Sequence, residues 1–102
     1  MHSDIPVEVA EAALINFGVA VTAYLHQSEI MGFSLVGRVY FDRKDRFANG
    51  RLIRTSDIAE FSERSGYLLA FTITQSAYVL VTPGAELLLM PEGKNDACRT
   101  YC

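Results

Sequence analysis

Residues 33–56, FSLVGRVYFDRKDRFANGRLIRTS, contain two apolar runs separated by a polar, charged loop. The first run is rich in aromatic and β-branched residues, which favour a β-strand. The loop ends in Asn49 and Gly50, a dipeptide typical of tight turns because both residues accept positive φ. The second run begins at Leu52 and predicts a returning strand that continues toward Ile58. Together these signals predict a β-hairpin in the middle of the chain.

A second hairpin is predicted further along the chain. The apolar runs 67–74 and 77–82 surround a short polar turn, which is the pattern of two buried strands. The side chains expected in its core are Ile73, Tyr78, Leu80 and, as a further candidate, Phe71. The two hairpins together predict most of an antiparallel sheet.

The N-terminal region predicts a helix. Apolar residues at helical spacing form one stripe there, namely Val7, Ala10, Leu14 and Phe17. Asp4 suits the helix N-cap. The same spacing continues to Tyr24 and leaves open a single helix of about six turns. Gly18 and the alternating residues after it favour a helix that ends near Phe17 and is followed by a strand.

Length and composition agree with one folded domain. The chain has 102 residues, of which 50% are hydrophobic and 21% charged, the balance of an ordinary globular domain. We predict an α+β domain over residues 1–90, with an N-terminal helix packed on an antiparallel β-sheet of four to six strands. Residues 91–102 are predicted to form a flexible tail. The most apolar window, 12–25, is too short for a membrane span, so no membrane partner is expected.

Charge is distributed unevenly along the chain. Residues 38–54 hold six bases and two acids, although the whole chain has a net charge of −3. Five of these bases are arginines, whose forked guanidinium groups suit carboxylates and phosphates. One interpretation is a solvated loop that keeps an end of the sheet soluble. The other is a binding site, for which the predicted contact residues are Arg43, Lys44, Arg46, Arg51 and Arg54.

No catalytic or metal-binding constellation is visible in the sequence. The histidines are His2 and His26, and neither stands in a recognisable nucleophile–base arrangement. Cys98 and Cys102 lie together near the end of the chain, without the two further ligands that a metal site needs. The glycines are scattered and form no phosphate-binding loop. We therefore expect a cytoplasmic protein that is neither an enzyme nor bound to a cofactor.

Two short patterns lie within residues 37–81. The first is Arg-Phe-x-Asn-Gly-x-x-Ile-x-Thr-Ser over 46–56. The second comprises Thr74, Ser76, Tyr78 and Leu80. Together they resemble small uncharacterised proteins of phages and prophages, in which Asp commonly stands where this chain has Asn49. The resemblance covers less than half of the chain, and it implies an origin in a mobile element rather than a chemistry.

Size and resemblance predict a small phage-type protein that acts by binding another protein. An inhibitor of a host defence system, such as an anti-CRISPR protein, is one role that fits. The expected partner is a host protein or protein complex with an acidic surface that meets the basic hairpin. A variant of this hypothesis is DNA mimicry by acidic faces, for which the candidates are Glu8, Glu11, Asp57, Glu60 and Glu63.

Two alternatives stay open. The first is a nucleic-acid-binding accessory protein that uses the basic 38–54 hairpin, because cations mixed with aromatic residues are typical of proteins that bind single strands. The second is a homodimer that forms through an exposed sheet edge or through the apolar segment 87–90.

Overall fold

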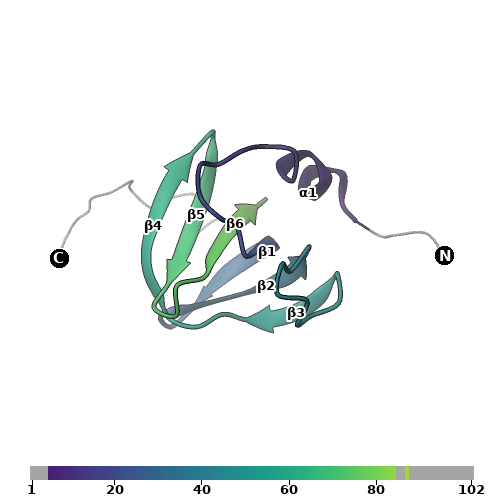
Figure 1. The fold of residues 1–102 in the computed structure, drawn as a ribbon. Coiled ribbons are helices and arrows are strands. Elements are labelled where there is room, and N and C mark those ends of the chain that lie inside the picture. The colour runs from purple at the N-terminus through teal and green to yellow at the C-terminus, as the bar shows by residue number, and fades with distance from the viewer. Residues whose placement is uncertain (1–4, 85–86, 88–102) are drawn as a thin grey trace.

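The computed structural model describes residues 5–84 and residue 87. This part of the chain is mostly β-structure, with a six-residue helix and a mixed sheet of six strands (Figure 1). The elements are α1 (Val7–Ala12), β1 (Ala23–Met31), β2 (Ser34–Tyr40), β3 (Arg51–Arg54), β4 (Ile58–Arg64), β5 (Tyr67–Thr72) and β6 (Ala77–Val81). The predicted α+β fold is therefore wrong, because the helix is too small to form a layer of its own. The predicted tail over 91–102 lies outside the described residues.

The sheet consists of two antiparallel meanders in the strand order β3-β2-β1-β6-β5-β4. β1, β2 and β3 form one meander, and β4, β5 and β6 form the other. The two meanders meet in a parallel pair, in which Ala23 lies opposite Tyr78 and His26 lies opposite Val81. The sheet is therefore mixed, and the prediction of a purely antiparallel sheet is wrong at this central pair.

The sheet rolls up because the segment between β3 and β4 contacts both meanders. The Thr55 N–H donates to the Leu35 carbonyl at 2.8 Å, and the Ile58 N–H donates to the Phe33 carbonyl at 2.7 Å, so this segment first follows β2. β4 then pairs with β5 instead. The strand predicted to run from Leu52 toward Ile58 is thus two strands with a bend between them, and Figure 1 shows the sheet curving from β3 to β4.

Side chains from all six strands fill the inside of this roll. The buried residues of this cluster are Ala23, Leu25, Leu35, Val39, Ile53, Ala70, Tyr78, Leu80 and Leu87. The predicted core positions of Tyr78 and Leu80 are confirmed. Ile73 is 63% exposed, so its predicted core position is wrong. The reason is that Ile73 follows the last residue of β5 and lies in the turn beyond the sheet.

The N-terminal segment covers the outer face of the sheet at β5 and β6. Its buried residues are Val9, Ala12 and Phe17, and they share a cluster with Leu69, Val79 and Val81. Phe71 is half-buried against the same cluster, on the outer face and not inside the roll. All residues of β6 are buried, because alternate side chains face the interior of the roll and this outer cover.

The helix is shorter than predicted. α1 ends at Ala12, whereas the apolar stripe predicted an end near Phe17. Phe17 is buried outside the helix, where its ring makes an edge contact with the ring of Tyr67 at 5.6 Å, and Leu14 is 86% exposed. Tertiary burial of Phe17 therefore outweighs the helical propensity of the stripe. No helix among the described residues is long and apolar enough to cross a membrane.

Candidate partner-binding site

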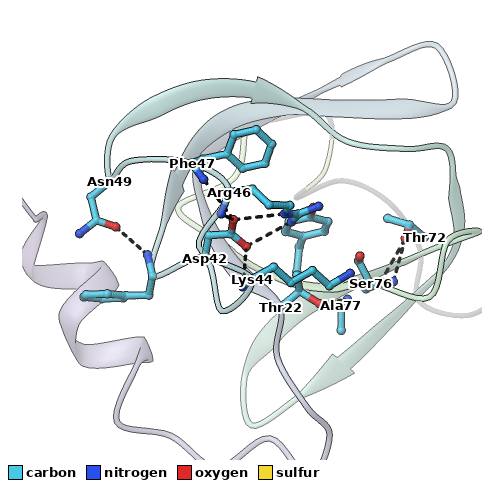
Figure 2. A network of polar contacts seen from close by, with 11 residues as sticks. Thr22, Asp42, Lys44, Arg46, Phe47, Asn49, Thr72, Ser76 and Ala77 are labelled. Carbon is cyan, nitrogen blue, oxygen red and sulfur yellow. Dashed lines mark hydrogen bonds and ion pairs between the residues drawn. The ribbon is translucent and has the colours of Figure 1, made fainter.

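The connection between β2 and β3, residues 41–50, is built around the carboxylate of Asp42 (Figure 2). We call this connection the basic loop. The side chain of Asp42 is fully buried and accepts hydrogen bonds from the backbone N–H groups of Lys44, Arg46 and Phe47, at 3.3, 2.7 and 3.2 Å. One carboxylate thus organises the backbone of half the loop, in the manner of an extended Asx turn.

The Arg46 side chain also binds the Asp42 carboxylate. Its Nε and Nη2 atoms donate to the two carboxylate oxygens of Asp42, each at 3.2 Å. Nη2 also lies 3.4 Å from the hydroxyl of Tyr78, and the guanidinium carbon lies 4.9 Å from the centre of the Phe47 ring. The Arg46 side chain is 38% exposed, so part of it faces solvent. Its main contacts are nevertheless internal, and they tie the loop to the interior of the roll.

The electrostatics of Asp42 favour its charged form. Burial by itself would raise the pKa of this carboxyl, because desolvation disfavours the ionised state. Hydrogen bonds from the Arg46 side chain and from the backbone of Arg46 and Lys44 outweigh burial and hold the pKa of Asp42 below its ordinary value of 3.8. The hydrogen bond to Asp42 in turn raises the pKa of Arg46. The two opposite charges therefore cancel each other at neutral pH.

The base of the loop is closed by Asn49 and Gly50. The side-chain oxygen of Asn49 accepts a hydrogen bond from the Phe41 N–H at 2.8 Å, and this bond holds Phe41 at φ +56 (Figure 2). Gly50 adopts φ +86, and its N–H donates to the Val39 carbonyl at 2.7 Å. Arg38 donates from Nη1 to the Gly50 carbonyl at 3.0 Å. The predicted turn at this dipeptide is confirmed, but the bridge from Asn49 to Phe41 has no signal in the sequence.

The predicted contact residues do not form one continuous surface. Arg43 and Lys44 are exposed within the basic loop, whereas Arg46 folds back onto Asp42. Arg51 and Arg54 belong to β3, three positions apart, so their side chains leave the strand on opposite faces. Arg51 follows the loop directly, and Arg54 lies at the far end of the strand. The loop therefore presents Arg43 and Lys44, with Arg51 beside it.

The two patterns that carry the resemblance to phage proteins contact each other. Arg46 of the first pattern meets Tyr78 of the second at 3.4 Å, and the hydroxyl of Thr74 donates to that of Ser56 at 3.2 Å. Thr55 of the first pattern accepts a hydrogen bond from the Leu35 N–H at 3.0 Å. The Arg46–Tyr78 and Thr74–Ser56 contacts join the two meanders, whereas the Thr55–Leu35 hydrogen bond lies within the first meander, so the spacing of these residues has a structural explanation.

The part of the chain that the structure describes contains no group of three or more potential metal ligands among His, Cys, Asp and Glu. The Nε2 atom of His26 and the hydroxyl of Ser28 are both buried without a hydrogen-bond partner, and hence they are not bonded to each other. These two residues therefore do not form a nucleophile–base pair.

Comparison with protein-family models, with curated proteins and with solved structures gave no match to this chain. Function is therefore inferred from the geometry of the basic loop.

Proposed function

We propose that the protein acts by binding another protein, and that the basic loop contacts an acidic surface of this partner. The observation that carries the proposal is the order of the loop before any partner arrives. The buried Asp42 carboxylate accepts three backbone N–H groups and the Arg46 guanidinium. A loop that is already ordered loses little conformational entropy on binding. Arg43 and Lys44 then meet the partner from a backbone that is already in position.

The distribution of charge favours a protein partner over a nucleic acid. Arg46 is neutralised by Asp42, and Asp45 adds an exposed negative charge to the same loop. Arg54 leaves β3 on the face opposite to Arg51. Few unbalanced cations are thus left on one surface, whereas affinity for a phosphate backbone grows with the number of phosphates that cations neutralise. The nucleic-acid-binding accessory protein is the second candidate, and the experiment below distinguishes the two.

A more specific role extends the proposal. Support for a phage or prophage origin comes from the resemblance carried by residues 46–56 and by Thr74, Ser76, Tyr78 and Leu80. A chain of 102 residues without a catalytic pattern suits an inhibitor that blocks a host defence protein, as anti-CRISPR proteins do. We place its action in the cytoplasm, in keeping with cysteines only at 98 and 102.

The experiment is a capture of partners by the tagged full chain. Nuclease-treated bacterial lysate at about 150 mM salt is passed over the protein, and bound proteins are identified by mass spectrometry. The test variant carries Arg43→Glu together with Lys44→Glu. The control is Arg54→Glu, a single charge reversal at a base away from the loop.

We expect one partner in near-stoichiometric amount, retained by the control and lost from the test variant. Equal capture by the test variant would remove the basic loop from the proposal. Recovery of nucleic acid alone, only when nuclease is omitted, would favour the accessory protein. Its affinity should then fall by orders of magnitude between about 50 and 200 mM salt.

A further inference from the structure

A second surface lies at the other end of the β1–β2 hairpin. The turn there exposes Phe33, a residue that is 82% accessible, and the nearby Met31 is also exposed. Ile73, in the turn between β5 and β6, is 63% exposed. These two turns lie close together at the lower left of Figure 1. We call Met31, Phe33 and Ile73 the tip patch.

Backbone hydrogen bonds fix the distance between the two turns. The peptide that joins Asp57 to Ile58 lies between them. Its N–H donates to the Phe33 carbonyl at 2.7 Å, and its carbonyl accepts from the Ile73 N–H at 2.9 Å. Because hydrogen-bonded strands lie about 4.8 Å apart, the backbones of Phe33 and Ile73 are separated by about 10 Å. Their side chains are near enough for one bound segment to contact both.

The turn that carries Phe33 is ordered. Met31 pairs with Ser34 across the hairpin, and Gly32 between them adopts φ +64, the pattern of a type II′ turn. The hydroxyl of Ser34 donates to the Asp57 carboxylate at 3.2 Å and ties the turn to the segment before β4. Large apolar side chains that an ordered backbone exposes outside the core are typical of protein-binding surfaces.

Acidic residues accompany the tip patch. Asp57 is exposed between its two halves, and Glu60 is exposed on β4, where it lies opposite Phe71, two positions before Ile73. The nearest base along this segment is Arg54, at the end of β3. Two copies docked through the same patch would bring their acidic groups together, which disfavours a symmetric dimer.

From this juxtaposition we propose that the tip patch binds a basic amphipathic segment of a partner protein, with its apolar side chains on Phe33 and Ile73 and its cations facing Asp57 and Glu60. This surface is separate from the basic loop, which stands at the opposite end of β1 and β2. Oppositely charged groups at the rim select the partner, and the apolar centre supplies most of the affinity.

Fluorescence anisotropy with labelled peptides tests this proposal. The probes are a peptide of alternating Leu and Lys, its Leu/Glu counterpart and a Ser/Lys peptide of the same length. The protein is tested as wild type, with Phe33→Ser plus Ile73→Ser, and with Asp57→Asn plus Glu60→Gln. Asparagine at 57 keeps an oxygen for the Ser34 hydroxyl. Leu14→Ser is the control, since Leu14 is 86% exposed but follows α1, away from the patch.

We expect the Leu/Lys peptide to bind most tightly. Its dissociation constant should rise at least about tenfold in the Phe33/Ile73 variant and should not change in the Leu14 control. The Asp57/Glu60 variant should bind the Leu/Lys peptide more weakly than the wild type does, and its affinity for the Leu/Glu peptide should not be lower.

Three results would overturn the proposal. The first is equal binding of the Leu/Glu peptide by the wild type, and the second is unchanged affinity in the Phe33/Ile73 variant. The third is a dimer in sedimentation that Phe33→Ser abolishes, which would assign the patch to a second copy. If the double variant does not fold, Phe33→Ser alone repeats the measurement, because an exposed turn residue contributes little to the core.

Discussion

The β1–β2 hairpin is closed at one end by a tight turn and opens at the other into the basic loop, and the two ends achieve order by different means. The tip turn reverses the chain with one glycine, Gly32, at positive φ. The basic loop holds two non-glycine residues, Phe41 and Asp45, at φ +56. Such conformations cost roughly 1–2 kcal/mol per residue. Hydrogen bonds to the buried Asp42 and from Phe41 to Asn49 offset this cost.

Exposure and backbone order are independent in this protein. Phe33 is 82% exposed on a turn that reverses at Gly32, and what it presents is apolar. Arg43 and Lys44 are exposed on a loop whose shape depends on a buried charge. Substitutions in the supporting residues should therefore damage the basic loop and spare the tip turn.

The largest effect is expected at Tyr78, where the basic loop contacts the interior of the roll. Its ring is buried in the core, and its hydroxyl lies 3.4 Å from Arg46. Tyr78→Ala should lower the free energy of unfolding by about 4 kcal/mol, because it leaves a cavity. Tyr78→Phe keeps the ring and should cost about 1 kcal/mol. Urea denaturation measures both, and equal losses would contradict the packing role of the ring.

Asp42 offers the most direct way to loosen the basic loop alone. Asp42→Asn replaces an oxygen that accepts backbone N–H groups and removes the charge that pairs with Arg46. We expect a loss of about 2 kcal/mol in the free energy of unfolding. Asp45→Asn, at an exposed site in the same loop, should change it by no more than about 0.5 kcal/mol. Similar losses in the two variants would show that the loop does not depend on the buried carboxylate.

Low pH should destabilise the basic loop, because it protonates the Asp42 carboxylate. The folded-state pKa of Asp42 is lowered, so its stabilising effect is fully present above the ordinary pKa of 3.8 and is lost as pH falls through the lower folded-state value. From about pH 4 downward, the wild type should therefore lose more stability than Asp42→Asn. Denaturation curves at several pH values measure this difference, and parallel losses would place the acid sensitivity elsewhere.

A smaller effect than at Tyr78→Ala or Asp42→Asn is expected at the tip turn. A Cβ atom at Gly32 would meet nothing within 4 Å, so Gly32→Ala adds only the strain of positive φ. We expect a loss of about 1 kcal/mol, with the amide spectrum of the basic loop unchanged. Perturbed loop amides in this variant would mean that the two ends of the hairpin are coupled.

The sequence predicts the strands of this fold better than their arrangement. Alternating and β-branched residues indicate β2 and β6, and the buried positions of Tyr78 and Leu80 follow from them. The sequence predicts too long a helix, because the apolar stripe that ends at Phe17 suits a helix as well as an extended segment packed on a sheet. β4 has no clean alternation, since a register shift separates Ile58 from Glu60. The parallel pairing of β1 with β6 depends on contacts between residues far apart in the chain, which local patterns do not encode.

The sequence indicates the candidate site as a concentration of charge, but it does not predict the contacts that hold the basic loop together. Counting bases gives Arg46 the same weight as Arg43, although Arg46 is held by Asp42 and Tyr78. The spacing of Arg51 and Arg54 within a strand already implies opposite faces. Phe33 and Ile73 are ordinary apolar residues in the sequence, and only the rolled sheet brings their turns together.

The most direct test of the account is amide hydrogen exchange in the isolated protein, followed by NMR. If the basic loop is ordered before it meets a partner, the N–H groups of Arg46 and Phe47 are donated to Asp42 in the free protein. These two amides should exchange much more slowly than those of an unstructured chain, and Asp42→Asn should abolish most of this protection. Exchange at the rate of an unstructured chain in the wild type would show that the loop is not ordered before binding.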